Sequence, residues 1–149
     1  MSFVISLKPK ICFIEGGIND VDAEIAPDSI AANLERMASL LKENRIIPVL
    51  MNVTHVADNY PKSAQMNKTI GELNKLIIGV ASKNQLQVIN LNPKIAPAGK
   101  LLPVYTRNDG NHLTSKLILS GKPRSTGCWS YTGYRMAGIL LLLRPPIFT

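Results

Sequence analysis

Apolar residues follow two different periodicities along the chain. Residues 11–14, 46–53 and 86–91 are short, nearly continuous apolar runs, which is typical of strands buried on both faces of a parallel sheet. Between them, apolar residues recur at helical spacing in residues 28–44 and again in residues 66–80. The order strand, helix, strand, helix, strand predicts right-handed crossovers and an α/β fold whose parallel sheet is covered by helices on both faces.

Proline, aspartate and asparagine residues mark the expected ends of the helices and strands. Pro27 and Asp28 open the first long helix, with Asp28 as its N-cap, and Asn44 closes it. Pro48 cannot donate to a strand ladder, so we place it near the beginning of the second strand. A last helix is expected from about Thr132 to Leu143, where a pair of prolines ends it.

The length of 149 residues indicates a single domain over residues 1–149. The net charge is +7, and residues 100–149 contribute seven basic residues against one acid. No aromatic interleaving accompanies this charge, so we interpret it as a solvated surface, and nucleic acid is not the favoured partner. A basic α/β module that binds nucleic acid stays open as an alternative.

No apolar run near either end approaches the roughly 20 residues that span a bilayer. The apolar start, residues 1–7, is followed by Lys8 and Lys10, the reverse of the order in a signal peptide. We therefore expect a soluble chain without a membrane span. Its compartment is unknown: cytoplasmic by default, and secreted if a native N-terminus lies upstream.

Two motifs carry the candidate chemistry. Gly16-Gly17-Ile18-Asn19-Asp20 directly follows the first strand, and Asp109-Gly110-Asn111-His112-Leu113-Thr114 lies in the long loop after the third strand. Ligands bind at the carboxyl ends of the strands in open parallel sheets. The pattern therefore predicts that Asn19 and His112 face a common cavity at this rim.

The residue types suit acyl transfer. At a spacing of three, the Asp109 carboxylate can reach Nδ1 of His112 and leave Nε2 pointing into the cleft as a base. Asn19, on a turn supported by Gly16 and Gly17, can donate to an oxyanion, an interaction worth about 3 kcal/mol in comparable sites. His55 follows the second strand on the same rim, where it either borders the pocket or is a surface-loop histidine.

Neither a metal nor a cofactor is expected. Two histidines and scattered acids do not converge by spacing on a metal site. Gly16-Gly17 lacks the third glycine of a dinucleotide-binding loop. Cys12, within the first apolar run, is interpreted as a small buried hydrophobe, and Cys128 lies in a polar segment.

In their order, the two motifs resemble the third and the last signature blocks of the SGNH (GDSL-type) hydrolase family. Residues 8–20 look like its third strand and block, the segment around Asn74 resembles a later helix, and Thr132-Gly133-Tyr134-Arg135 resembles the start of its final helix. The resemblance implies a three-layer α/β/α sandwich of flavodoxin-like type. It also implies hydrolysis of an ester, often a short acyl or acetyl group on a sugar or lipid. Asn19 would be an oxyanion donor, and Asp109 and His112 would be triad members.

The sequence departs from the family pattern in three ways. The Gly-Asp-Ser strand with its nucleophile, the following helix and strand, and the block with the second oxyanion donor have no counterpart, so the fold is expected to be N-terminally truncated. An insertion at about residues 115–131 precedes the Gly-Tyr segment. Without the two additional strands, residues 11–14 become a sheet edge, which favours self-association unless residues 1–7, with alternating apolar positions, cover it.

Four functions remain open. The first is an SGNH-type esterase acting on a small-molecule ester, represented here by its C-terminal two-thirds. The second is a catalytically dead SGNH-like binding module. The third is a hydrolase that uses a substitute nucleophile from the insertion, for which the candidates are Ser115, Ser125, Cys128 and Ser130. The fourth is the nucleic-acid-binding module named above. The acyl group, the alcohol, the activity and the oligomeric state are not specified by the sequence.

Overall fold

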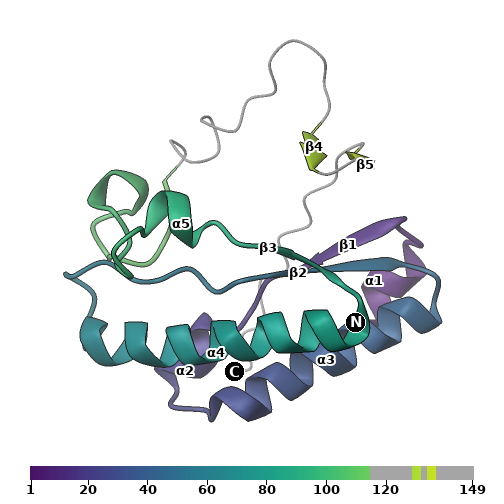
Figure 1. The fold of residues 1–149 in the computed structure, drawn as a ribbon, viewed down its shortest axis with the longest axis horizontal. Helices are drawn as coiled ribbons and strands as arrows, with labels where there is room; N and C mark the ends of the chain where they lie inside the picture. The colour runs from purple at the N-terminus through teal and green to yellow at the C-terminus, as the bar shows by residue number, and fades with distance from the viewer. Residues whose placement is uncertain (115–128, 132–133, 137–149) are drawn as a thin grey trace.

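Three parallel strands form the centre of the computed structural model, which describes residues 1–114, 129–131 and 134–136 (Figure 1). β1 (Ile11–Ile14), β2 (Ile47–Met51) and β3 (Gln87–Ile89) pair in the order β1-β2-β3. The register places Ile14 beside Leu50, and Leu50 beside Val88. The parallel α/β architecture expected from the sequence is therefore confirmed.

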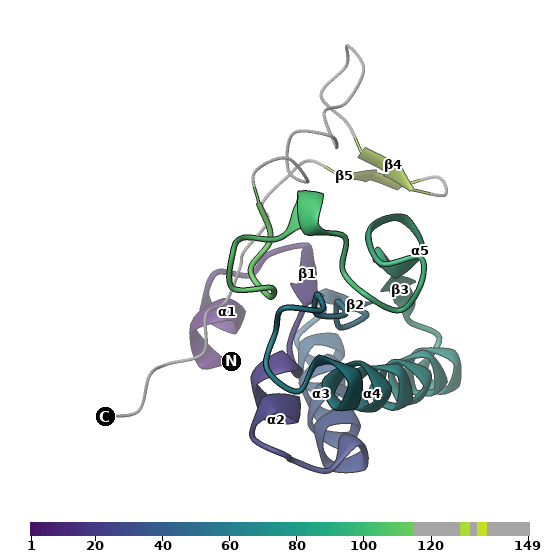
Figure 2. The same ribbon diagram turned by 90° about the vertical axis from the view of Figure 1, so that its left-hand side faces the viewer.

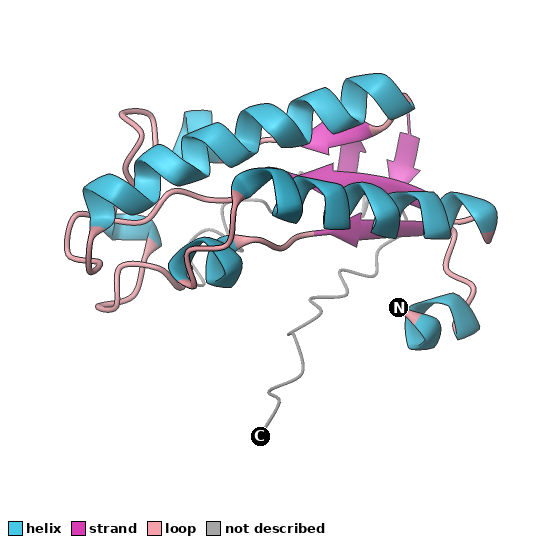
Figure 3. Ribbon diagram, turned by 90° about the horizontal axis from the view of Figure 1, so that it is seen from below, coloured by secondary structure: helices cyan, strands magenta, loops and turns pink. Residues whose placement is uncertain are grey.

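The two crossover helices lie on the same face of this sheet. α3 (Pro27–Glu43) connects β1 to β2, and α4 (Ser63–Asn84) connects β2 to β3. Right-handed crossovers between strands added in one direction place successive helices on one side. Figure 3 shows both helices running across the sheet.

The main core lies between these helices and the sheet. Apolar residues with less than a tenth of their surface exposed come from α3, α4 and the inward positions of the strands. They include Ile30, Leu34, Leu41, Leu50, Ile70, Leu73 and Ile77. Burying a side chain of this size contributes about 1.5–3 kcal/mol, so the periodic stripes of the sequence account for the packing of both helices.

The helix boundaries differ in detail from the sequence expectation. Ala26, not Asp28, is the N-cap of α3; Pro27 occupies the first helical position, and the Asp28 carboxylate lies in the first turn. Proline suits this position because its missing N–H would have no helical partner there. Asn44 does end the helix, and its Nδ2 donates to the Leu40 carbonyl at 2.8 Å.

Two predicted elements near the ends of the chain differ from the structure. Residues 1–7 do not form an alternating strand, because Ser2–Ser6 is the short helix α1, with Val4 in the core and Phe3 exposed. The final helix expected over residues 132–143 lies mostly outside the described residues. Its described part, Tyr134–Met136, is strand β5, which pairs antiparallel with β4 (Trp129–Tyr131). The insertion at 115–131 lies outside the described residues apart from β4.

A groove of about 550 Å³ is lined by all three strands and, near where β2 and β3 begin, by Lys42, Arg45 and Gln85 at the ends of the crossover helices. Its apolar lining includes Phe13 on β1, Val49 on β2 and Ile89 on β3, all at positions that alternate with the core residues. In the part of the chain that the structure describes, β1 pairs with β2 alone and is an edge strand. None of the described helices is both long and apolar enough to cross a bilayer.

We propose that the edge of β1, which has no strand partner among the described residues, mediates self-association together with the groove beside it. Unpaired strand edges recruit other strands, and an inward-pointing lysine suppresses such pairing. In sedimentation velocity experiments, the chain is expected to show a concentration-dependent rise in sedimentation coefficient. Phe13→Lys should reduce this rise, whereas Ile78→Lys, which adds the same charge on the exposed side of α4, should not. A monodisperse monomer over the same concentration range contradicts the proposal.

Candidate active site

The carboxyl ends of the three strands meet at one edge of the sheet. Gly16, Asn52 and Asn90 follow within two residues of the ends of β1, β2 and β3, and the N–H of Asn52 donates to the Ile89 carbonyl at 2.9 Å. Figure 2, which faces this edge, shows α2 (Ile18–Asp22), α5 (Asn92–Ile95) and the loop that follows α5 around it. The first motif is therefore located at the rim where ligands bind in such sheets.

Gly17 allows the chain to turn sharply after β1. Its φ of +116° is a conformation that L-residues rarely adopt, and a Cβ atom would lie 3.0 Å from Cδ2 of Leu73. The turn leads directly into α2, where Asn19 occupies the first turn and is exposed. Close packing of Gly17 against α4 thus fixes where the Asn19 backbone leaves the sheet.

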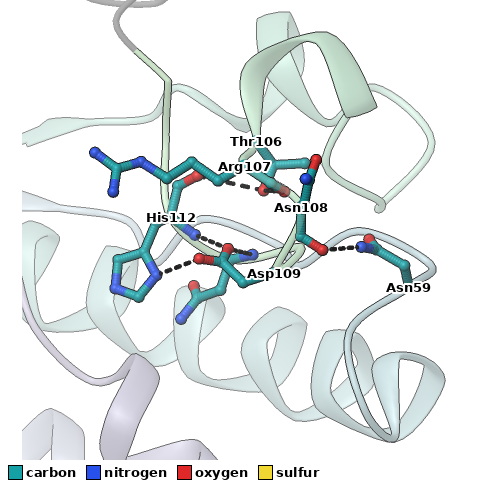
Figure 4. A network of polar contacts seen from close by, with 7 residues as sticks. Asn59, Thr106, Arg107, Asn108, Asp109 and His112 are labelled. Atoms are coloured by element: carbon teal, nitrogen blue, oxygen red, sulfur yellow. Dashed lines mark hydrogen bonds and ion pairs between the residues drawn. The ribbon is translucent and has the colours of Figure 1, made fainter.

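Asp109 and His112 lie in contact, as their spacing predicts (Figure 4). Oδ2 of Asp109 is 2.9 Å from Nδ1 of His112, while Oδ1 accepts the backbone N–H groups of Asn111 and His112, both at 2.9 Å. The side chain of His112 is 71% exposed, so its ring is open to a reactant. The carboxylate therefore orients the imidazole from within a single tight loop.

The same hydrogen bonds keep Asp109 ionised. The backbone N–H of Asn111, followed by that of His112, lowers the pKa of Asp109 to about 2. Hydrogen bonds to the charged form of a carboxyl group favour that form. Asp109 is thus an anion throughout the pH range in which a histidine base works, and it can stabilise an imidazolium.

The loop that carries Asp109 and His112 is attached to the loop that follows β2. The N–H of Ala57 donates to the Gly110 carbonyl at 2.8 Å, and Nδ2 of Asn59 donates to the Asn108 carbonyl at 2.7 Å. Gly110 has φ +78°, and a Cβ atom there would lie 2.7 Å from Oδ1 of Asn59. The position of the Asp109–His112 pair therefore depends on residues 57–60.

Tyr60 lies beside the end of α2 and beside the loop that carries Asp109 and His112. Burial, followed by the negative charges of Asp22 and Asp109, raises the pKa of Tyr60. Asp22 ends α2, which carries Asn19, and Asp109 belongs to the loop of His112. A Cβ atom on Gly110 would also lie 3.0 Å from the backbone nitrogen of Tyr60. The groove of about 550 Å³ on the sheet face does not involve the two motifs.

Three asparagines whose role the sequence analysis missed hold the loop after β2. Asn74 in α4 accepts the N–H of Val53 at 2.7 Å and donates to its carbonyl at 2.9 Å. Asn67 forms the equivalent pair with Val56, at 2.8 and 2.9 Å. Asn92 accepts from the N–H of His55 at 3.1 Å and donates to the Val53 carbonyl at 2.9 Å. An asparagine on the apolar stripe of a helix is the signal that could have found Asn74.

His55 belongs to this clamped loop and is half-buried. No group of three His, Cys, Asp or Glu side chains among the described residues could hold a metal ion. Cys12 is buried in β1, and burial raises the pKa of its thiol, so it behaves as the small hydrophobe expected. Cys128 lies outside the described residues.

Comparison with known proteins identifies the family. Residues 3–116 match the family model described as "GDSL-like Lipase/Acylhydrolase family". The chain belongs to this family. Its SGNH-type resemblance is thereby confirmed, and the match includes both motifs.

Three solved structures share the fold. A GDSL-like lipase from Bacteroides thetaiotaomicron is 32% identical, with a TM-score of 0.64 over 76% of this chain and 58% of that chain. A putative acylhydrolase from Bacteroides fragilis is 26% identical, with a TM-score of 0.63 over 76% and 57%. An acetyl xylan esterase, 21% identical with a TM-score of 0.63 over 76% and 63%, shows the same fold. These neighbours place the chain in the α/β/α class of the SGNH hydrolases.

A curated relative matches this chain over a smaller share of its own length than the solved structures do. The N-acylneuraminate cytidylyltransferase of Streptococcus agalactiae serotype V is 26% identical over 104 residues, which are 70% of this chain and 24% of that protein. The chain thus spans about a quarter of that relative and somewhat under two-thirds of the solved structures.

Replacing Gly110 by alanine tests the attachment of the loop that carries Asp109 and His112. The added Cβ and the positive φ should together cost about 1–3 kcal/mol and release residues 108–112 from residues 57–60. Urea unfolding should show a lower midpoint. The matched control is Gly71→Ala in α4, where a Cβ meets nothing within 4 Å and helix propensity should raise stability by up to about 1 kcal/mol. Equal midpoints for the two variants would contradict this account.

Acid titration tests the hydrogen bonds to Asp109. Because the folded-state pKa is below the unfolded value, the stabilisation is present above about pH 4 and is lost as the pH falls towards about 2. The amide shifts of Asn111 and His112 in NMR spectra should move with a midpoint near pH 2. They should not titrate in this range in Asp109→Asn. A midpoint near the ordinary aspartate value of about 3.9 shows that the N–H groups do not hold the carboxylate.

Proposed function

We propose that this chain carries the acid–base half of an acyl-ester hydrolase. The observation that carries the proposal is the contact between Asp109 and His112, with 2.9 Å between Oδ2 and Nδ1, in a chain of the GDSL-like family. An imidazole held at Nδ1 by a permanently ionised carboxylate presents Nε2 as a general base. The expected substrate is a small ester with a short acyl group on a sugar or lipid.

In the proposed reaction, Nε2 of His112 removes the proton of a nucleophilic hydroxyl as that oxygen attacks the ester carbonyl. The carboxamide of Asn19 donates to the oxygen of the tetrahedral intermediate, where the negative charge develops. Asp109 stabilises the imidazolium, which then gives its proton to the departing alcohol. Water repeats the same cycle on the acyl intermediate and releases the acid.

The nucleophile is the part that this sequence does not match. No Gly-Asp-Ser block occurs in it, and Asp28-Ser29 begins α3 without a glycine before it. The nucleophilic hydroxyl of the proposed reaction is therefore not assigned to a residue of this sequence. The absence of the block specifically favours the second candidate, a binding module that keeps the family fold without turnover.

Hydrolysis of p-nitrophenyl acetate, with and without a fluorophosphonate probe for an activated serine, distinguishes these functions. Turnover is expected to fall by at least about 10² in His112→Ala, because a positioned base contributes that much or more. Asp109→Asn should also lose activity. Glu24→Gln is the matched control, since Glu24 is another exposed loop carboxylate, paired with Lys62.

Unchanged turnover in His112→Ala contradicts the assignment of His112 as the base. Failure of the parent chain to exceed the buffer rate, together with no labelling by the probe, favours the binding module.

A further inference from the structure

Arg107 lies opposite His112 at the base of the loop that carries the Asp109–His112 pair. Thr106 and Leu113 form an antiparallel bridge, and one position closer to the turn the N–H of Arg107 donates to the His112 carbonyl at 2.8 Å. Side chains at opposite positions of an antiparallel pair project to the same face. Figure 4 shows the Arg107 guanidinium and the His112 imidazole extending to the same side of the loop.

The backbone of Arg107 is held at both of its polar groups. Its carbonyl accepts the N–H of Gly110 at 3.0 Å and the hydroxyl of Thr106 at 3.1 Å, while its N–H is bonded to His112. The side chain therefore leaves the loop from a fixed point next to the residue proposed as the base. A group that is positioned before its ligand arrives gives up less conformational freedom on binding.

The charge of Arg107 is not used within the part of the chain that the structure describes. The residue is exposed, and no ion pair among the described residues includes it. By contrast, Lys100, earlier in the same part of the chain, is paired with Asp58 at 2.8 Å. The Asp109 carboxylate is bonded to N–H groups of its own loop and to the His112 ring, not to Arg107. A positive charge thus stays available on the side of the loop where His112 lies.

We propose that Arg107 binds an anionic group, a carboxylate or a phosphate, carried by the ester on which His112 acts. A guanidinium offers parallel N–H donors that match two oxygens of either anion. The inference rests on the proposed function, since it names the class of substrate for the same site. Nε2 of His112 works at the ester bond itself, so a charged group close to that bond, on the acyl or the alcohol portion, faces the neighbouring arginine.

Paired esters that differ in charge but not in size test this role on the full chain. 4-Acetoxybenzoate and 4-acetoxybenzamide differ in the alcohol portion, and the 4-nitrophenyl esters of adipate and adipamate differ in the acyl portion. In at least one pair, Arg107→Gln should lower kcat/KM for the carboxylate ester by about fivefold, the upper end for an exposed ion pair, and change the amide ester by less than about twofold. The pair that responds identifies the portion that carries the anion.

Two further variants distinguish anion binding from a structural effect of Arg107. Arg36→Gln is the matched control, since Arg36 is exposed on α3 and the substitution removes the same charge. It should leave both pairs unchanged. Arg107→Lys keeps the charge without the paired donors and should keep part of the preference. Equal effects of Arg107→Gln on the carboxylate and amide esters of both pairs overturn the proposal.

A binding measurement gives a result that does not depend on turnover. 4-Hydroxybenzoate, phenyl phosphate and the neutral 4-hydroxybenzamide are titrated into the chain labelled with nitrogen-15, and the Nε–H signal of Arg107, assigned with Arg107→Gln, is followed by NMR. The two anions should shift this signal, and added salt should weaken the effect, because screening acts on exposed charges. The amide should not shift it. A shift no larger than that of the Arg36 Nε–H signal shows only the attraction of anions to any surface arginine and overturns the proposal.

The two readouts separate this inference from the proposed function. If the anions shift the Arg107 signal but no ester is hydrolysed above the buffer rate, Arg107 remains an anion-binding residue and the esterase proposal fails. If the esters are hydrolysed in a reaction that requires His112, but Arg107→Gln affects charged and neutral esters equally, the anion site alone fails.

Discussion

The site depends on how the backbone is hydrogen-bonded where the strands end. The ladder hydrogen bonds of a parallel sheet stop at the carboxyl end of each strand. The loops that follow are partly buried, so their backbone N–H and C=O groups need other hydrogen-bond partners. Here amide and carboxylate side chains supply them. Asn67, Asn74 and Asn92 bond the loop after β2, and Asp109 bonds the N–H groups of its own loop. A side chain that satisfies both backbone groups of one residue fixes that residue almost as a neighbouring strand would.

The replacement of strand-ladder bonds by side-chain hydrogen bonds explains which parts of the structure could be predicted from the sequence. The three strands, the two long helices and the contact between Asp109 and His112 follow from periodicity and from a spacing of three, both of which are local properties. The strands proved shorter than their apolar runs, because Val53 lies beyond β2 but has its backbone bonded to Asn74 and Asn92 instead of β3. Apolar content alone does not distinguish these two situations.

Other features depend on distant contacts and were not predictable. The first residues alternate like a strand, yet Val4 is buried in the core from a helix, and tertiary packing overrides so short a pattern. Asp28 was expected to cap α3, but Pro27 suits the first helical position and moves the cap to Ala26. Similarly, the role of Asn92 is apparent only when α5 is folded beside the loop after β2.

The contacts that position the Asp109–His112 pair come from its own loop and from one neighbouring loop. The contact within the Asp109–His112 pair depends on its own loop, since the carboxylate is held by N–H groups two and three residues away. Its attachment runs to residues 57–60, on the loop after the central strand β2, and not to the exposed edge of β1. The Asp109–His112 pair is therefore positioned through the loop after β2, the central strand of the described sheet, and not through the groove or the edge of β1.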